Sequence, residues 1–376
     1  MAYSNAARFR GKAINGCLTI KKLLAFLGVL NVAFISIRPH IFYAASRTGS
    51  KGYLVRRQVF FMNISFLLNG ETVALKNADP HLTCLDFLRE QRNLSGSKEG
   101  CNEGDCGACT VIVLDKEIIR PLNACILFLG QLNGKAIRTV EAVGEGGHLH
   151  PVQSEMVEKH GSQCGFCTPG IVTSLVAAQI NGRSDHENIL AGNLCRCTGY
   201  APIIKAAETA AVLSEPTWLR EDRKKIRDIS ASPNANWPQS SDEIAALLTA
   251  NPKTRLIAGA TDVALWVTKG LQDVSPSAFL ANVEDLSQIE DRQGEYVIGA
   301  LVTIEALFNW AKVSCRPYAE LLRRYGSVQI RNAATLGGNI ANGSPIGDNP
   351  PVLIAPKGEK VTLKIRESSG SKSLSL

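Results

Sequence analysis

The strongest constraint on the fold of this chain is the position of its cysteines. Three of the eleven, Cys17, Cys84 and Cys315, lie alone, and the other eight form two tight groups. The first group is Cys101, Cys106, Cys109 and Cys125, and the second is Cys164, Cys167, Cys195 and Cys197. An odd number cannot all pair, and such clustering indicates metal ligation in a reducing compartment rather than a disulfide framework. We therefore expect a cytoplasmic metalloprotein.

The first group has the spacing C-x4-C-x2-C, followed by Cys125. This is the spacing of plant-type [2Fe–2S] proteins. Three thiolates must converge from one loop, and Gly100, Gly104 and Gly107 permit the positive φ angles that such a loop needs. Zinc sites more often show two C-x2-C pairs, so zinc and a pair of disulfides are the weaker alternatives.

The second group combines one C-x2-C pair, in Gln163-Cys164-Gly-Phe-Cys167, with one C-x-C pair, in Asn193-Leu-Cys195-Arg-Cys197. Both pairs come just before or at the start of a predicted helix. The free N–H groups and positive dipole end of a helix N-terminus favour an anionic cluster. On spacing alone, zinc remains an alternative for this group.

Charge divides the chain into an unusual leader and a different body. Residues 1–61 contain ten Lys or Arg and no Asp or Glu, so removing them from a net charge of +7 leaves −3 for residues 62–376. Nothing in this slightly acidic body indicates nucleic-acid binding. The apolar run Leu23 to Ile37 is too short to span a bilayer. A signal peptide and a mitochondrial transit peptide are alternatives, but we favour an atypical basic N-terminal extension before Met62.

From Met62 onward the hydrophobic pattern predicts regular elements. A strand over 63–68, an Asn69-Gly70 turn, a return strand over 71–75, a helix over 84–91 capped by Thr83 and a strand over 110–114 form a small α+β domain over 62–138. Helical spacing over 151–160, 169–180 and 203–213 predicts a helical domain over 139–215. Residues 216–240, rich in Pro, Ser, Asn and charge, are expected to be a linker. A third domain over 241–376 is expected to begin with a helix over 243–248 capped by Ser241, with strands at 256–257 and 296–298.

Taken together, Cys-Asn-Glu-Gly-Asp-Cys-Gly-Ala-Cys, Gln-Cys-Gly-Phe-Cys-Thr-Pro-Gly and Asn-Leu-Cys-Arg-Cys-Thr-Gly-Tyr resemble the molybdenum hydroxylase family, in particular the iron–sulfur and flavin chains of its xanthine dehydrogenase type. The resemblance covers residues 62 to about 360. It implies an α+β multidomain fold: a β-grasp, plant-type ferredoxin-like domain, a four-helix [2Fe–2S] domain and an α+β FAD-binding domain. It also implies that each cysteine group holds one [2Fe–2S] cluster. Gln163 is expected to lie against the molybdopterin of a partner, with a helix-capping amide as the alternative.

Two small-residue turns in the third domain are weak signals alone, where an ordinary tight turn is the simpler interpretation. The family resemblance implies that they line FAD. The expected lining residues are Arg255, Leu256, Ile257, Ala258, Gly259, Ala260, Thr261, Asp262, Tyr325, Thr335, Leu336, Gly337, Gly338, Asn339 and Asp348.

The resemblance implies that the chain relays electrons in a hetero-oligomer. A molybdopterin-binding large subunit would oxidise a purine, and electrons would pass through the two clusters to FAD and then NAD, with neither membrane nor nucleic acid as a partner. The alternatives are a stand-alone two-cluster carrier, or the same subunit of an aldehyde, nicotinate or carbon monoxide dehydrogenase. Family members continue beyond the position of Lys357, so we expect the flavin domain to be incomplete and FAD retention to be weakened.

Overall fold

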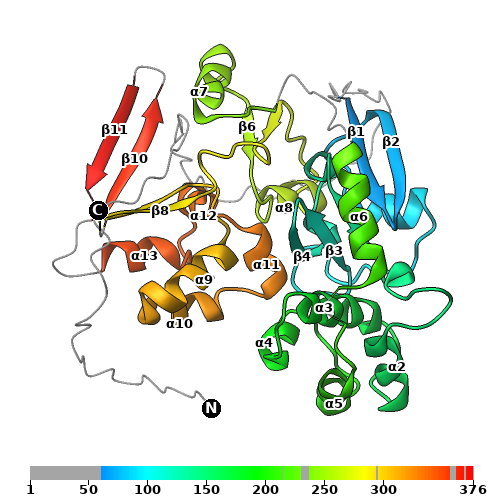
Figure 1. Ribbon diagram of the computed structural model, residues 1–376. Coiled ribbons are helices and arrows are strands. Elements are labelled where there is room, and N and C mark those ends of the chain that lie inside the picture. Colours follow the sequence, from blue (N-terminus) through cyan, green and yellow to red (C-terminus); the bar gives the residue numbers. More distant parts are fainter. Residues whose placement is uncertain are drawn as a thin grey trace, which may run out of the picture.

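The computed structural model describes residues 61–213, 215–229, 237–293, 295–355, 361–367 and 370–375. Figure 1 shows a sheet-containing first part, a helical second part below it and a third part beside both. Residues 1–60 of the expected extension lie outside the described residues. Within the described part of the chain, no helix is both long and apolar enough to cross a membrane.

The first part contains a mixed five-stranded sheet in the order β2-β1-β5-β3-β4. Strands β1 (Met62–Leu68) and β2 (Glu71–Ala78) form the predicted hairpin, in which Asn69 and Gly70 take φ angles of 53° and 87°. The predicted strand near 110 is β3 (Thr110–Asp115). Two further strands, β4 (Ile118–Asn123) and β5 (Ala136–Arg138), were missed because Arg120-Pro121 interrupts the pattern of one and the other has three residues.

Short helices complete the core of the first part. Thr83 caps α1 (Cys84–Asp86), as predicted, by accepting a hydrogen bond from the Asp86 N–H, and the chain continues as a π-helix over Phe87–Gln91. Single 3-10 turns follow at Ala124–Ile126, Leu129–Leu132 and Val140–Ala142. Phe66, Phe87 and Phe128 are buried in one hydrophobic core with the first two of these turns.

The second part contains α2 (Pro151–Glu158), α3 (Thr168–Ile180), α4 (His186–Leu190) and α5 (Ala201–Thr209). Helix α3 is apolar around most of its circumference because it packs against both β3 and its neighbouring helices. Helix α5 ends earlier than the predicted residue 213, and Val212 and Leu213 are exposed beyond it. The prediction also missed the short α4.

The expected linker over 216–240 is wrong in one respect, because its first half is the packed helix α6 (Thr217–Asp228). Trp218, Leu219 and Ile226 face the core of the second part, and the buried Asp222 pairs with Arg138. Every other position except Thr217 is charged, so the narrow buried stripe is hard to see in the sequence. Residues 230–236 of this segment lie outside the described residues.

The third part begins with α7 (Ser241–Ala250), which Ser240 caps rather than the expected Ser241. Strands β6 (Arg255–Ile257) and β7 (Ser277–Phe279) pair in parallel, with α8 (Val263–Thr268) between them. Strands β8 (Ile289–Arg292) and β9 (Glu295–Ile298) then form an antiparallel pair. The elements after β9 are α9 (Ile304–Ser314), α10 (Arg316–Arg324), α11 (Val328–Ala333), α12 (Leu336–Asn342), α13 (Asn349–Ile354), β10 (Thr362–Glu367) and β11 (Gly370–Ser375).

The start of the third part shares a hydrophobic core with the first part. Trp237, Ile257 and Phe279 are buried in the same cluster as the side chains of β1 and α1. His81 Nε2 lies 2.6 Å from Ser277 Oγ. A Cβ on Gly130 would lie 2.5 Å from the Phe279 ring, so the two parts meet without a gap. This shared core holds the third part firmly against the first cysteine group.

His150 should make stability depend on pH. Its Nδ1 accepts the Val152 N–H at the start of α2, its Nε2 is buried without a partner, and burial lowers the pKa of its ring from 6.5 to about 4. The unfolded chain therefore binds the proton first as pH falls. The contribution of neutral His150 to the free energy of unfolding is fully present above pH 6.5. It is lost as the pH falls toward 4, which lowers the stability by about 3 kcal/mol. In urea unfolding between pH 7 and pH 4, the free energy of unfolding of the wild type should fall more steeply than that of His150→Asn. Asparagine keeps the helix cap but does not titrate. Parallel curves would contradict this assignment.

Candidate functional site: two cysteine groups and an adjoining cavity

The first cysteine group lies between the loop before β3 and the turn after β4. Cys101 Sγ accepts the N–H groups of Asp105 and Cys106, each at 3.3 Å. Cys109 and Cys125 are buried. Gly107 takes a φ of +70°, the left-handed conformation expected for this loop. The loop thus curls around its own thiols, with backbone N–H groups directed at sulfur.

The four thiols of the first group interact with one another. The Cys106 thiol, and then that of Cys125, hold the pKa of Cys101 well below its usual range, and the Cys125 thiol lowers the pKa of Cys109. As the donors of these hydrogen bonds, Cys106 and Cys125 have raised pKa values. The four thiols therefore lie close enough to hydrogen-bond to one another. A cationic iron core would replace the thiol protons, because a coordinating thiol is deprotonated, so this set of soft sulfur ligands fits a [2Fe–2S] cluster.

The second cysteine group lies at the starts of α3 and α5. Cys167 directly precedes α3, and Cys195 and Cys197 precede α5. The Tyr200 hydroxyl accepts the Cys195 N–H at 2.8 Å and donates to the Asn193 carbonyl at 3.0 Å, which fixes the turn. Cys164 and Cys197 are exposed, whereas Cys195 is buried. This group therefore opens to the molecular surface.

The thiols of the second group are also coupled in pairs. The Phe166 N–H, and then the Cys197 thiol, lower the pKa of Cys164, and the hydrogen bond to Cys164 raises the pKa of Cys197. Burial, and then Cys195, raises the pKa of Cys167 to about 12. Burial also raises the pKa of Cys195, but hydrogen bonds, chiefly from Thr198, outweigh it and lower that pKa. The donor set fits a second cluster for the same reason as the first.

Gln163 is exposed next to Cys164. The capping residue of α3 is Cys167, with no side-chain hydrogen bond to the helix, so the structure does not support the alternative of a helix-capping amide. The expected contact of Gln163 with a pterin stays a prediction.

The two cysteine groups are joined by direct backbone contact. The Leu194 N–H donates to the Cys106 carbonyl at 2.9 Å. A Cβ on Gly107 would lie 2.0 Å from the Gly192 carbonyl oxygen, and a Cβ on Gly170 would lie 2.1 Å from the Gly107 carbonyl oxygen. Gly107 and Gly170 thus let the two loops approach more closely than any side chain would permit.

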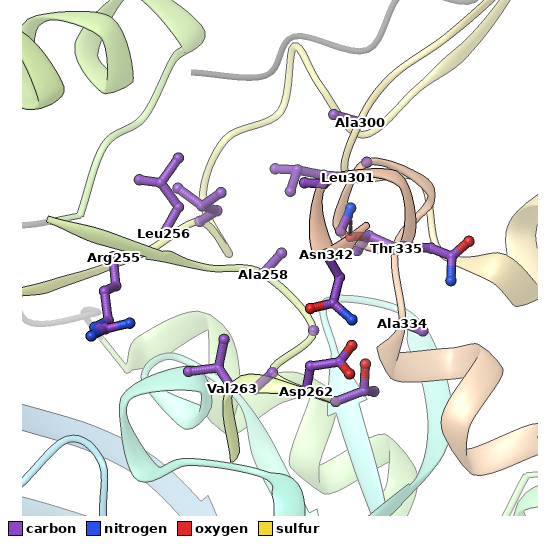
Figure 2. Close-up of a pocket in the computed structure, with 18 of the residues that line it drawn as sticks. Arg255, Leu256, Ala258, Asp262, Val263, Ala300, Leu301, Ala334, Thr335 and Asn342 are labelled. Carbon is purple, nitrogen blue, oxygen red and sulfur yellow. Dashed lines mark hydrogen bonds between the residues drawn. The ribbon is translucent and has the colours of Figure 1, made fainter. Parts of the chain in front are cut away.

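A cavity of about 510 Å³ lies in the third part, between the turn after β6 and the segment around α12 (Figure 2). This volume lies within the usual range for ligand sites. A Cβ on Gly259 would lie 1.8 Å from the Ala333 carbonyl oxygen, so glycine is required where the two walls meet. The predicted residues that line it are Arg255, Leu256, Ala258, Gly259, Ala260, Thr261, Asp262, Tyr325, Thr335, Gly337, Gly338 and Asn339.

Three predicted lining residues lie elsewhere. Ile257 and Leu336 are buried in hydrophobic cores, because the alternation of β6 and the inner face of α12 turn them away from the cavity. Asp348 is not part of the lining either, but its charge acts on Tyr325.

The prediction missed Ile244, Leu248, Pro252, Thr254, Val263, Trp266, Leu280, Leu286, Ala300, Leu301, Ala334, Ala341 and Asn342. Most of these are apolar residues on distant elements, and the sequence does not distinguish them from ordinary core.

Among the residues that line the cavity, three are titratable: Arg255, Asp262 and Tyr325. Burial raises the pKa of Asp262, and Figure 2 shows its carboxyl group pointing toward the Asn342 amide. Burial, and then the charges of Asp262 and Asp348, raise the pKa of Tyr325 to about 12, so its hydroxyl stays protonated. The same hydroxyl accepts a hydrogen bond from the Asn339 side-chain amide. Arg255 lies over the Trp266 ring. Apolar walls with glycine-lined backbone and few charges fit a large planar cofactor such as FAD.

Three family models match this chain in order. They are the 2Fe-2S iron-sulfur cluster binding domain at residues 66–130, the [2Fe-2S] binding domain at 139–208 and the FAD binding domain in molybdopterin dehydrogenase at 231–376. The first two matches contain one cysteine group each, and the third contains all the residues that line the cavity.

Curated relatives extend the similarity across these domains. Xanthine dehydrogenase of Drosophila subobscura is 33% identical over 77% of this chain and 27% of its own length. Xanthine dehydrogenase/oxidase of Rattus norvegicus is 30% identical over 80% of this chain and 28% of its own length. The chain thus spans about a quarter of these relatives. Among solved structures, a chain of quinoline 2-oxidoreductase from Pseudomonas putida 86 is 32% identical, with 45% of this chain and 97% of that chain covered and a TM-score of 0.36.

Proposed function

This chain belongs to the molybdenum hydroxylase family, and we propose that it is the electron-transfer subunit of a xanthine dehydrogenase-type enzyme. The chain carries two [2Fe–2S] clusters and FAD. Each cluster carries one electron at a time, and FAD can pass on two electrons. The proposal includes a molybdopterin-binding large subunit that oxidises a purine such as hypoxanthine or xanthine, and NAD as the final acceptor.

The observation that carries this proposal is the linear order of the three candidate sites. The second cysteine group opens to the surface, with Phe166 and Leu194 exposed beside it. The first group contacts the second through the hydrogen bond from Leu194 to Cys106. On its other side, Cys109 and Cys125 share a hydrophobic core with Ala260 of the cavity turn and with Ile257, the residue of β6 just before that turn. A site at the surface, a second and more buried site, and a cavity that contact one another in this order suit an electron relay.

The cysteines, Gln163 and the residues that line the cavity have different roles in the proposed relay. The four cysteines of each group hold one cluster, and the N–H groups of Asp105 and Cys106 stabilise negative charge at Cys101. The exposed Gln163 would face the molybdopterin of the partner. The turn from Ala258 to Asp262 and the residues Thr335 to Asn339 would hold FAD. None of these side chains supplies an acid or base for the hydroxylation itself.

Filling the cavity should separate flavin binding from cluster binding. Gly338 lines the cavity, so the large side chain of Gly338→Phe should occupy part of the flavin space. We expect most of the FAD to be lost with iron content unchanged, measured as the flavin-to-iron ratio after gel filtration. Val313→Phe is the control, because Val313 is 90% exposed on α9. Full flavin retention in Gly338→Phe would place FAD elsewhere.

The wild-type ratio also tests whether FAD retention is weakened, which stays a prediction. The rival function, a stand-alone two-cluster carrier, is tested by tagging the chain and purifying it from its native cell. A co-purifying molybdopterin subunit supports the proposed function, and its identity would define the substrate. Recovery of the chain alone, with reducible clusters but no partner, would favour the rival.

A further inference from the structure

Gln329 on α11 is a residue of the flavin-binding part that reaches the junction between the two cysteine groups. Its side chain is 1% exposed. Its Nε2 lies 2.9 Å from Asn193 Oδ1, 3.1 Å from Ser174 Oγ and 3.4 Å from Thr110 Oγ1. These three acceptors are buried and belong to the first two parts of the molecule. One amide group therefore contacts all three parts at a single point.

Asn193 connects this amide to both cysteine loops. Its Nδ2 donates to the Gly107 carbonyl at 3.1 Å, between Cys106 and Cys109. The next residue, Leu194, donates its N–H to the Cys106 carbonyl and precedes Cys195. The position of Asn193 thus determines how the second loop lies on the first.

The packing around this junction leaves no room for another arrangement. A Cβ on Gly192 would lie 2.2 Å from Ser327 Cβ and 2.5 Å from Gln329 Oε1. Apolar residues would hold such a buried interface together at least as well, because desolvating a polar group costs free energy. What the directional hydrogen bonds add is a defined geometry.

We propose that Gln329 is a positioning residue that fixes, through Asn193, the relative placement of the two cysteine loops and so sets the electronic coupling between the two clusters. The inference rests on the proposed function, in which each loop holds a [2Fe–2S] cluster. It makes the flavin-binding domain a determinant of the junction between two sites that lie outside it.

The test is low-temperature EPR of the fully reduced full chain, in which two adjacent spins split each other's signals. Gln329→Met keeps the length of the side chain and removes the amide. We expect both cluster signals at full intensity, with the splitting between them reduced. Tyr318→Phe is the control, because it removes a buried hydrogen bond to Asn349 in the same domain, within the core around α9 and α10. Its splitting should equal that of the wild type.

An unchanged splitting in an iron-loaded Gln329→Met protein would overturn the inference. If Gln329→Met does not load iron, Gln329→Asn replaces it, since it keeps an amide but shortens its reach toward Asn193. A reduced splitting in Gln329→Asn supports the inference, and an unchanged one overturns it. A wild-type protein without two cluster signals would instead contradict the proposed function.

Discussion

Replacing Cys106 with Ser is expected to abolish one of two [2Fe–2S] EPR signals and to remove half of the iron. Serine is a harder ligand than a thiolate and is not deprotonated at neutral pH, so it replaces the soft sulfur ligand poorly. Cys106 also hydrogen-bonds to Cys101, so its loss disturbs the rest of the first group. The signal of the second group should persist, because its thiols interact only with one another among the described cysteines.

The reciprocal variant, Cys195→Ser, should remove the other signal and keep the first. Cys84→Ser is the matched control, since Cys84 is fully buried in the core of the first part yet belongs to neither group. It should keep both signals. Zinc in place of iron, or one signal in a protein with every cysteine intact, would contradict the assignment of two clusters.

Removing Asp222 is expected to destabilise the folded chain strongly. Arg138 Nε and Nη2 each lie 2.7 Å from a carboxylate oxygen of Asp222, and the side chain of Asp222 is 1% exposed. Asp222→Ala would leave the buried guanidinium without its partner, which costs about 3–5 kcal/mol in comparable sites. The expected result is a lower urea midpoint for the second part of the molecule, which depends on α6 for part of its core.

The control for Asp222→Ala is an exposed ion pair between a residue of the same helix and the turn between β3 and β4. Arg227 and Glu117 are 71% and 61% exposed, so breaking their pair with Arg227→Ala should change stability by about 0–1 kcal/mol. Replacing both buried partners, with Arg138→Met and Asp222→Leu together, should recover most of the loss, because no charge is then left unpaired. Similar effects for Asp222→Ala and Arg227→Ala would show that α6 is not anchored by the buried pair.

Much of this protein could be predicted from local sequence. The Asn69-Gly70 hairpin, the Thr83 cap and the apolar spacing of α3 each depend on residues a few positions apart, and the structure contains all three. The cysteine spacing likewise concerns short loops, so the sequence could indicate which thiols come together within each group. The family models that match over 66–130 and 139–208 support two cluster domains there.

Tertiary structure decided what depends on contacts between distant residues. The helix α6 appeared to be a linker because most of its residues are charged, and only its packing against Arg138 reveals the buried stripe. The apolar wall of the cavity, the core shared by Phe279 with the first part, and the reach of Gln329 to Asn193 also join residues far apart in the chain. Local pattern reports the periodicity of a segment and the conformations its residues permit. Which buried surface meets which other surface depends on how the whole chain fills its interior, and no short segment carries that information.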